Sequence, residues 1–493
     1  MSFLYQNWSQ NKFISNLYLG FGVILLLVCN AIQVKAQDTH HWGNQFGTRA
    51  ALLGGAVLTD TVDNAGVFYN PGNLGYLDTT SLTINANLYG LENIKIENAL
   101  GQRADFKGLR FNTVPLLISG SIQTKSSWNL SYGLLTPVSF NFNGVARIEG
   151  NFEIAPENIS PGKEEVVSES GINTKLQETT LAVGFGKKLS PNLGFGLSLL
   201  NTIRTVDYSY RFSAKTLTNS QDYYLISRTQ NEFINYFALR TALKVGLNFQ
   251  KESYGLGIAV TTPSLDWLGN GTVAEDLTLT NLPVQGIARP VNAYASDRQE
   301  KLKTTYKSPF EIAFGAHKAF NRSILSLNVT HFGGFDKYRI IDAEPGVLVR
   351  PEEVDQAFDN EDFLNVETAM KPVTNVAIGY ENQLKETLTL LASFRTDFSY
   401  FDDKALETSQ METEITQWDI FHLSLGTEIK KSRSSLTLGL IYSFGSTQDY
   451  LQRGSFNNVE ADQILEGALV ITKASYSNFG LLIGYSFNFK KFN

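Results

Sequence analysis

Apolar and polar side chains alternate residue by residue along most of this chain, and this pattern is the strongest constraint on its fold. In segment 478–489, Phe, Leu, Ile and Tyr occupy the odd positions, whereas Asn, Gly and Ser occupy the even positions apart from Leu482. Segments 436–444 and 237–249 follow a similar alternation. Because successive side chains of a strand point to opposite faces of a sheet, we predict strands from about residue 80 onward.

The two faces of these expected strands differ in a way that indicates a membrane barrel. Nearly every strand would have one apolar face and one small, polar or charged face, which is typical of lipid outside and a polar lumen inside. A soluble sandwich also alternates, but it needs a second sheet to cover its apolar faces. Membrane helices are excluded, because nothing after residue 36 reaches 18 uninterrupted apolar residues.

The connections between the expected strands alternate between short and long. Six short turns and seven long loops imply an all-β, antiparallel transmembrane barrel of about fourteen strands, with both termini on the short-turn side. The turns are expected at 125–127, 188–191, 250–252, 320–322, 382–386 and 430–434, and the long loops at 91–113, 141–172, 211–232, 269–302, 337–371, 401–416 and 447–474.

The first 36 residues predict export. An apolar run at 17–29 is followed by Val34-Lys35-Ala36, which supplies small residues for cleavage before Gln37. Lipidation of Cys29 is the alternative, although Val28 stands where a small residue is preferred. We therefore expect residues 1–36 to be a signal peptide, 37–78 a plug and 79–493 the barrel, in the outer membrane of a Gram-negative bacterium.

Segment 46–74 is the expected plug. Its alanines and glycines suit close packing inside a container, and it ends in the turn Asn70-Pro71-Gly72. Pro71 fixes its own φ, Gly72 tolerates positive φ, and the Asn70 amide can bond to nearby backbone. Arg49 is expected to pair with a carboxylate of the lumen, such as Glu311.

The same segment resembles the amino-terminal pattern of the FadL/TodX family of outer-membrane channels for hydrophobic compounds. The matching residues are 47–50 (Gly-Thr-Arg-Ala), 54–56 (Gly-Gly-Ala), Asp60 with Asp63, and 68–72 (Phe-Tyr-Asn-Pro-Gly). Gly72 departs from the alanine usual in the family. The resemblance implies that external loops catch fatty acids or aromatic hydrocarbons. The ligand would then leave sideways through a kink in the third strand, after the plug shifts.

Pro137 is the residue of this chain that could form such a kink. It lies in the expected third strand, at about 128–140, and proline cannot donate to a sheet ladder. It therefore either opens a lateral gap in the wall or marks the upper end of the strand. With Arg49, Asn70, Pro71 and Gly72, it completes the set of expected gate and plug residues.

Charged residues with inward parity are the candidates for ligand contacts. Arg204, Arg240 and Lys244 could bind the carboxylate of a fatty acid, for which arginine offers a bidentate partner. The alternative is a ladder of lumen salt bridges that holds the plug. Arg395 and Asp397 are expected to pair with each other. The apolar segment 265–268 could belong to a ligand-catching groove in the loops, or pack on neighbouring loops.

Other classes of function find little support. The chain contains no nucleophile elbow, phosphate-binding loop or zinc-protease motif, so we expect no enzyme activity, cofactor or metal. A net charge of −7 argues against a nucleic-acid partner. The sequence favours a monomeric passive channel for hydrophobic small molecules, surrounded by outer-membrane lipids. The alternative is a non-conducting barrel that acts as a shuttle or scaffold in type IX secretion.

Overall fold

A computed structural model describes residues 40–61, 65–77, 81–115, 117–124, 127–282, 290–351, 363–406, 416, 418–452, 456, 465 and 469–488. The predicted signal peptide, with Cys29, lies outside these ranges. Among the described residues, three short helical segments precede the strands: α2 (Thr48–Leu52), α3 (Gly66–Tyr69) and the 3-10 helix η1 (Pro71–Tyr76). Within the described part of the chain, no helix is long and apolar enough to cross a membrane.

The strands form one antiparallel barrel. Starting at β1, each strand pairs with the next along the chain, and β21 pairs back with β1. Fourteen consecutive strands result among the described residues when interrupted strands are joined, as predicted. They are β1 (Ser81–Ile96), β2 with β3 (Phe106–Pro115, Leu117–Gln123), β4 with β5 (Asn129–Leu135, Ser139–Phe152), β6 (Glu164–Ser190), β7 (Leu193–Leu217), β8 (Leu225–Gln250), β9 with β10 (Tyr254–Thr261, Leu265–Leu282), β11 with β12 (Val291–Leu302, Glu311–Phe320), β13 with β14 (Ser323–Phe332, Phe335–Ile341), β16 with β17 (Val366–Met370, Val373–Lys385), β18 (Leu388–Asp397), β19 (Ile420–Lys431), β20 (Ser434–Leu451) and β21 (Ile471–Asn488).

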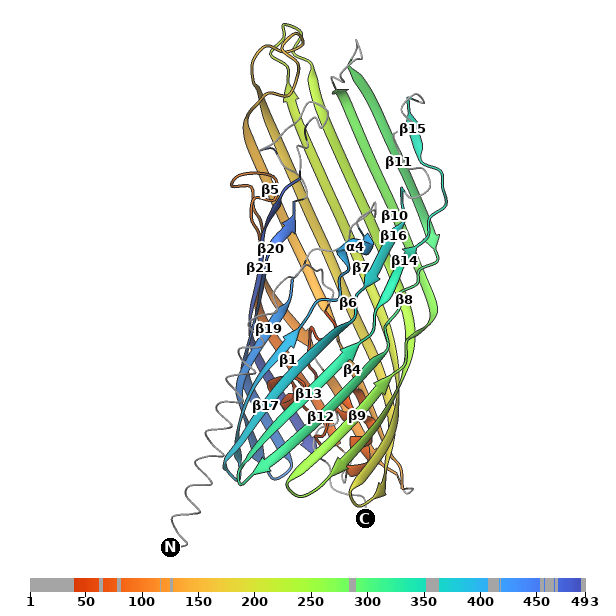
Figure 1. The fold of residues 1–493 in the computed structure, drawn as a ribbon, viewed down its shortest axis with the longest axis vertical. Helices are drawn as coiled ribbons and strands as arrows, with labels where there is room; N and C mark the ends of the chain where they lie inside the picture. The colour runs from red at the N-terminus through yellow and green to blue at the C-terminus, as the bar shows by residue number, and fades with distance from the viewer. Residues whose placement is uncertain are drawn as a thin grey trace.

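Several smaller elements complete the described part of the molecule. The short strand β15 (Leu348–Arg350) pairs with β11, and β14 pairs with β16 in a separate two-stranded sheet. The helix α4 (Asp403–Leu406) follows β18. Figure 1 shows the plug helices, coloured red to orange, inside the lower half of the barrel.

One side of the barrel is much taller than the other. Strands β6, β7 and β8 contain 27, 25 and 26 residues, whereas β18 contains 10. In Figure 1 the tall wall of β5 to β8, β10 and β11 rises far above the rest. The loops predicted at 141–172, 211–232 and 269–302 are therefore largely strand, and that prediction was wrong. The loop predicted at 91–113 is also mostly strand, since β1 continues to Ile96 and β2 begins at Phe106.

The error has a physical cause. In the lower part of β7, apolar side chains such as Leu199 and Ile203 point outward and are exposed. In its upper part, Tyr208 and Phe212 point inward and are buried. The apolar face thus passes from the outside to the inside of the wall where β7 rises beyond the lipid-facing band. The alternation continues through this switch, but it no longer matches the pattern expected of a membrane strand.

Candidate functional site

The plug rests against glycines on the inner wall of the barrel. A Cβ atom on Gly196 would lie 2.1 Å from the Pro71 carbonyl oxygen, and one on Gly246 would lie 2.0 Å from the Asn70 Oδ1 atom. A Cβ atom on Gly186 would lie 2.7 Å from the same carbonyl oxygen. Gly186, Gly196 and Gly246 therefore form a seat for the plug that only glycine can provide.

The turn at the end of the plug differs in part from its prediction. The Gly72 backbone N–H donates to the Asn70 Oδ1 atom at 2.9 Å, as expected, and the Asn70 amide also donates to the carbonyl of Leu247 on the wall. However, Gly72 lies in the 3-10 helix that begins at Pro71 and does not have positive φ. It is required for close approach, since its Cβ would lie 2.9 Å from the Asn248 backbone nitrogen.

Arg49 anchors the plug to the wall. Its guanidinium pairs with Glu381 at 2.5 Å and with Glu428 at 2.8 Å, and its Nε atom lies 3.6 Å from Asp60. All these groups are largely buried. The prediction that Arg49 pairs with Glu311 is wrong, because the Glu311 carboxylate pairs with the Lys244 Nζ atom at 3.0 Å.

Residues 40–45 cross the lumen above the plug, and we name this segment the crossbar. At one end, the Asn44 backbone N–H donates to the Pro137 carbonyl at 3.2 Å, and its amide donates to the Thr136 carbonyl at 3.1 Å. At the other, the Arg395 guanidinium donates to the carbonyls of residues 42 and 43, while Asp397 accepts from the Trp42 backbone N–H. The crossbar thus joins the kink region to β18.

Two neutral histidines begin the crossbar. The His40 Nε2 atom lies 3.0 Å from the Trp418 carbonyl oxygen, so its proton is on that nitrogen. The His41 ring stacks on Phe332 with centroids 4.1 Å apart. Burial lowers the pKa of His40 to about 4 and that of His41 to about 3. Both rings are therefore uncharged at neutral pH.

One cavity lies beside the crossbar and contains the predicted ligand-binding residues. We name it the Arg240 cavity. Glu178 bridges Arg204 at 2.9 Å and Arg240 at 2.7 Å. The Tyr306 ring lies 3.8 Å from the Arg204 Cζ atom. The cavity is lined by crossbar, plug and wall residues that include His41, Phe68, Glu178, Arg204, Arg240, Lys244, Tyr306, Phe332, Met370 and Tyr400.

The structure brings Arg204, Arg240 and Lys244 together and pairs each with a carboxylate. The ladder of lumen salt bridges is therefore present. Lys244 also contacts the plug, since its Nζ atom lies 4.9 Å from the centre of the Phe68 ring. Within the described residues, the buried Nη1 atom of Arg240 is left without a hydrogen-bond acceptor.

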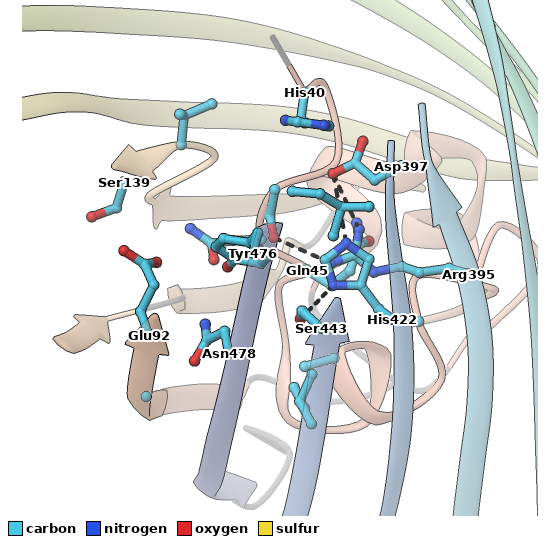
Figure 2. A pocket seen from close by; sticks show the side chains of 18 of the residues that line it. His40, Gln45, Glu92, Ser139, Arg395, Asp397, His422, Ser443, Tyr476 and Asn478 are labelled. Atoms are coloured by element: carbon cyan, nitrogen blue, oxygen red, sulfur yellow. Dashed lines mark hydrogen bonds and ion pairs between the residues drawn. The ribbon is translucent and has the colours of Figure 1, made fainter. Parts of the chain in front are cut away.

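A second, polar cavity lies on the other side of the crossbar, and we name it the polar cavity. Figure 2 shows its lining side chains converging from β1, β18, β19, β20 and β21. His422 donates or accepts a hydrogen bond with the Ser443 hydroxyl at 2.7 Å and lies 3.8 Å from Asp397. The labelled residues are His40, Gln45, Glu92, Ser139, Arg395, Asp397, His422, Ser443, Tyr476 and Asn478.

Pro137 interrupts its strand in the middle, not at its upper end. β4 ends at Leu135, β5 begins at Ser139 and continues to Phe152. Below the interruption, β4 pairs with both neighbours, β3 and β6. Above it, among the described residues, β5 pairs with β6 alone and β2 pairs with β1 alone. The wall therefore lacks a hydrogen-bonded ladder between β2 and β5.

Several residues of the site escaped sequence reasoning. Glu178 shares the inward parity of Arg204 and Arg240, and that signal could have identified it as their partner. The crossbar histidines and Tyr306 lie in irregular segments, where parity gives no information. Their positions follow from tertiary packing.

Fold and site together define a transmembrane β-barrel with an internal plug and two lumen cavities separated by a crossbar. Solved structures share this fold. The chain is similar to a FadL homologue from Pseudomonas aeruginosa (12% identity, TM-score 0.54, covering 93% of this chain and 99% of that one) and to the toluene transporter TodX from Pseudomonas putida (15%, 0.55, 92% and 100%). The toluene transporter TbuX from Ralstonia pickettii is a further match (11%, 0.50, 91% and 99%). No family model and no curated protein match the chain. The fold is that of FadL-type barrels. At the level of the fold, this confirms the resemblance seen in residues 47–72.

Proposed function

We propose that this protein is a passive outer-membrane channel for hydrophobic small molecules. After export directed by residues 1–36, the barrel would stand in the outer membrane of a Gram-negative bacterium. A ligand would occupy the Arg240 cavity, pass the crossbar and leave sideways between β2 and β5, above Pro137. No energy source is needed, because the ligand moves down its own gradient.

One observation carries this proposal: the crossbar is the shared wall of the two cavities. His40, Asn44, Gln45 and Val138 line both. The crossbar is also bonded to the Pro137 carbonyl at the interruption of the third strand. A movement that frees Asn44 would therefore join the cavities and uncover the unpaired part of the wall in the same step.

The lining of the Arg240 cavity favours a ligand that is mostly apolar. Aromatic rings surround cations that already have carboxylate partners, so a neutral hydrocarbon can enter without breaking an ion pair. A single polar or charged oxygen could still accept from the Arg240 Nη1 atom. Aromatic hydrocarbons and long-chain fatty acids both meet this description. The solved relatives described as toluene transporters support the first of them.

Uptake of radiolabelled toluene and oleate by cells that produce the barrel tests the proposal. We expect both compounds, or toluene alone, to enter several-fold faster than in cells with an empty vector. Arg240→Met should reduce oleate uptake more than toluene uptake, since only oleate has an anionic oxygen for the guanidinium. Uptake equal to the vector control, with secretion components copurifying, would reject the channel and favour the shuttle or scaffold function.

A further inference from the structure

A second interruption of the barrel wall lies between β9–β10 and β11–β12. β9 ends at Thr261 and β10 begins at Leu265, while β11 ends at Leu302 and β12 begins at Glu311. Each break contains a proline, Pro263 in one and Pro309 in the other. Proline has no N–H to donate, so a regular ladder cannot run through this part of the wall.

Two serines hold this part of the wall together. The Ser264 backbone N–H donates to the Ser308 carbonyl at 3.1 Å, and the Ser308 backbone N–H donates to the Ser264 hydroxyl at 2.8 Å. One of the two bonds thus uses a side chain in place of a backbone carbonyl. We name this contact the serine seam.

The inner side of the serine seam belongs to the Arg240 cavity. Ser264, Ser308 and Pro309 line that cavity. The Ser308 hydroxyl also accepts a hydrogen bond from the Arg240 Nε atom at 2.5 Å. The seam is therefore connected directly to the cation whose Nη1 atom lacks an acceptor.

The outer side of the seam carries an apolar patch. Leu265, Trp267 and Leu268 are 66%, 67% and 60% exposed. A β-bulge between Asp266 and Leu268 brings Trp267 and Leu268 out together on the same face. The sequence predicts this segment in a loop groove or packed on neighbouring loops, but the structure places it in β10.

The patch lies at the upper edge of the lipid-facing band. Leu268 is paired with Leu239, which is paired with Ile203 on β7. Ile203 is the last exposed apolar side chain of β7 before the polar outer face of the tall wall. A tryptophan at this level suits the boundary between the lipid tails and the polar layer above them.

We propose that the serine seam is a lateral entrance through which apolar molecules dissolved in the outer leaflet reach the Arg240 cavity. This rests on the proposed channel function. A molecule collected on the patch of Leu265, Trp267 and Leu268 would pass between the two serines. Among the described residues, two hydrogen bonds join Ser264 to Ser308, and both must be broken for this passage. Both form again when the seam recloses.

A disulfide across the seam tests the entrance. In the double variant Ser264→Cys/Ser308→Cys, toluene uptake should fall several-fold under oxidation and recover with dithiothreitol. The control Asn201→Cys/Thr241→Cys links two paired residues on the outer face of β7 and β8, and its uptake should not depend on oxidation. Unchanged uptake by the oxidised seam variant, with the bond verified by mass spectrometry, would overturn the entrance and leave the channel intact. Vector-level uptake by every form would overturn the channel itself.

A second variant tests the patch without a disulfide. Trp267→Ala should lower the initial rate of toluene uptake at low toluene concentration by about two- to fivefold, because dispersion and burial of a large aromatic surface are lost. Phe479→Ala is the matched control, since Phe479 is 52% exposed on β21, away from both interruptions, and its rate should stay at the wild-type value. Equal rates for the two variants would count against collection at the patch.

Discussion

The barrel wall is interrupted at Pro137 and again at Pro263 and Pro309. The two interruptions have the same cause but are closed by different contacts. Both arise where proline removes a ladder donor, at Pro137 in one place and at Pro263 and Pro309 in the other. The interruption at Pro137 is covered from inside by the crossbar, which bonds to the Thr136 and Pro137 carbonyls. The second is closed within the wall by Ser264 and Ser308. Proline therefore interrupts the ladder in both places, and different contacts close the two interruptions.

The two cavities also differ. The Arg240 cavity reaches both the serine seam and Pro137 and is rich in aromatic rings and paired cations. The polar cavity reaches Val138, Ser139 and Phe140, just beyond Pro137, and has fewer aromatic rings in its lining. We therefore expect an apolar ligand to be held better in the Arg240 cavity than in the polar cavity. Loss of the crossbar should affect release at Pro137 much more than entry at the serine seam.

Of the substitutions that follow, replacing Arg49 should have the largest effect on the stability of the plug. Arg49→Met leaves Glu381 and Glu428 without their buried partner, and breaking such a pair typically costs about 3–5 kcal/mol. We expect a destabilised plug, a lower midpoint of thermal unfolding and leakage of hydrophilic dyes. Arg147→Met removes an exposed pair with Glu149 and should leave the midpoint of thermal unfolding nearly unchanged. Equal midpoints for the two variants would contradict the anchoring role of Arg49.

Filling the plug seat should have the next largest effect. Gly196→Val forces atoms into the space of the Pro71 carbonyl, and overpacking of this kind costs about 1–3 kcal/mol. Limited proteolysis of the purified barrel should then cut segment 46–76 faster than in the wild type. Gly162→Val is the control, because no atom lies within 4 Å of a Cβ there, although its positive φ adds some local strain. A plug of unchanged resistance would show that the seat does not depend on this glycine.

Protonation of the crossbar histidines should weaken the crossbar by a smaller, graded amount. Both folded pKa values lie below 6.5, so the unfolded segment binds more protons at acidic pH. Docking is therefore fully stable above about pH 6.5 and weakens as the pH falls toward 4. Hydrogen exchange of residues 40–46, corrected for intrinsic rates, should accelerate from pH 7 to pH 5. The variant His40→Asn/His41→Phe should lose this pH dependence, and its persistence would assign the effect to other groups.

Removing the kink should have the smallest effect on stability and a clear effect on transport. Pro137→Val restores an N–H to the third strand, which is worth about 0.5–1.5 kcal/mol if it pairs. Toluene uptake should fall by several-fold, because the wall above residue 137 can then close. Pro263→Val instead alters the serine seam and should slow entry without changing hydrogen exchange of the crossbar. Identical behaviour of the two variants would remove the distinction between the two interruptions.

The sequence predicted the strand number because lipid imposes a simple rule on the lower barrel, where apolar side chains must point outward. That rule placed the turns and gave Arg204, Arg240 and Lys244 their inward parity. It failed in the upper part of β7, where Tyr208 and Phe212 point inward and no lipid is present to set the pattern. It also could not pair Arg49 with Glu381 and Glu428, since those contacts depend on how the plug is placed in the lumen.

The most direct test of the central claim is to lock the crossbar to the kink. In the variant Asn44→Cys/Val138→Cys, a disulfide would fix the wall between the two cavities. The account predicts that toluene uptake by oxidised cells falls to the vector level and returns when dithiothreitol reduces the bond. Uptake at the wild-type rate with the bond formed would contradict release past Pro137 under control of the crossbar.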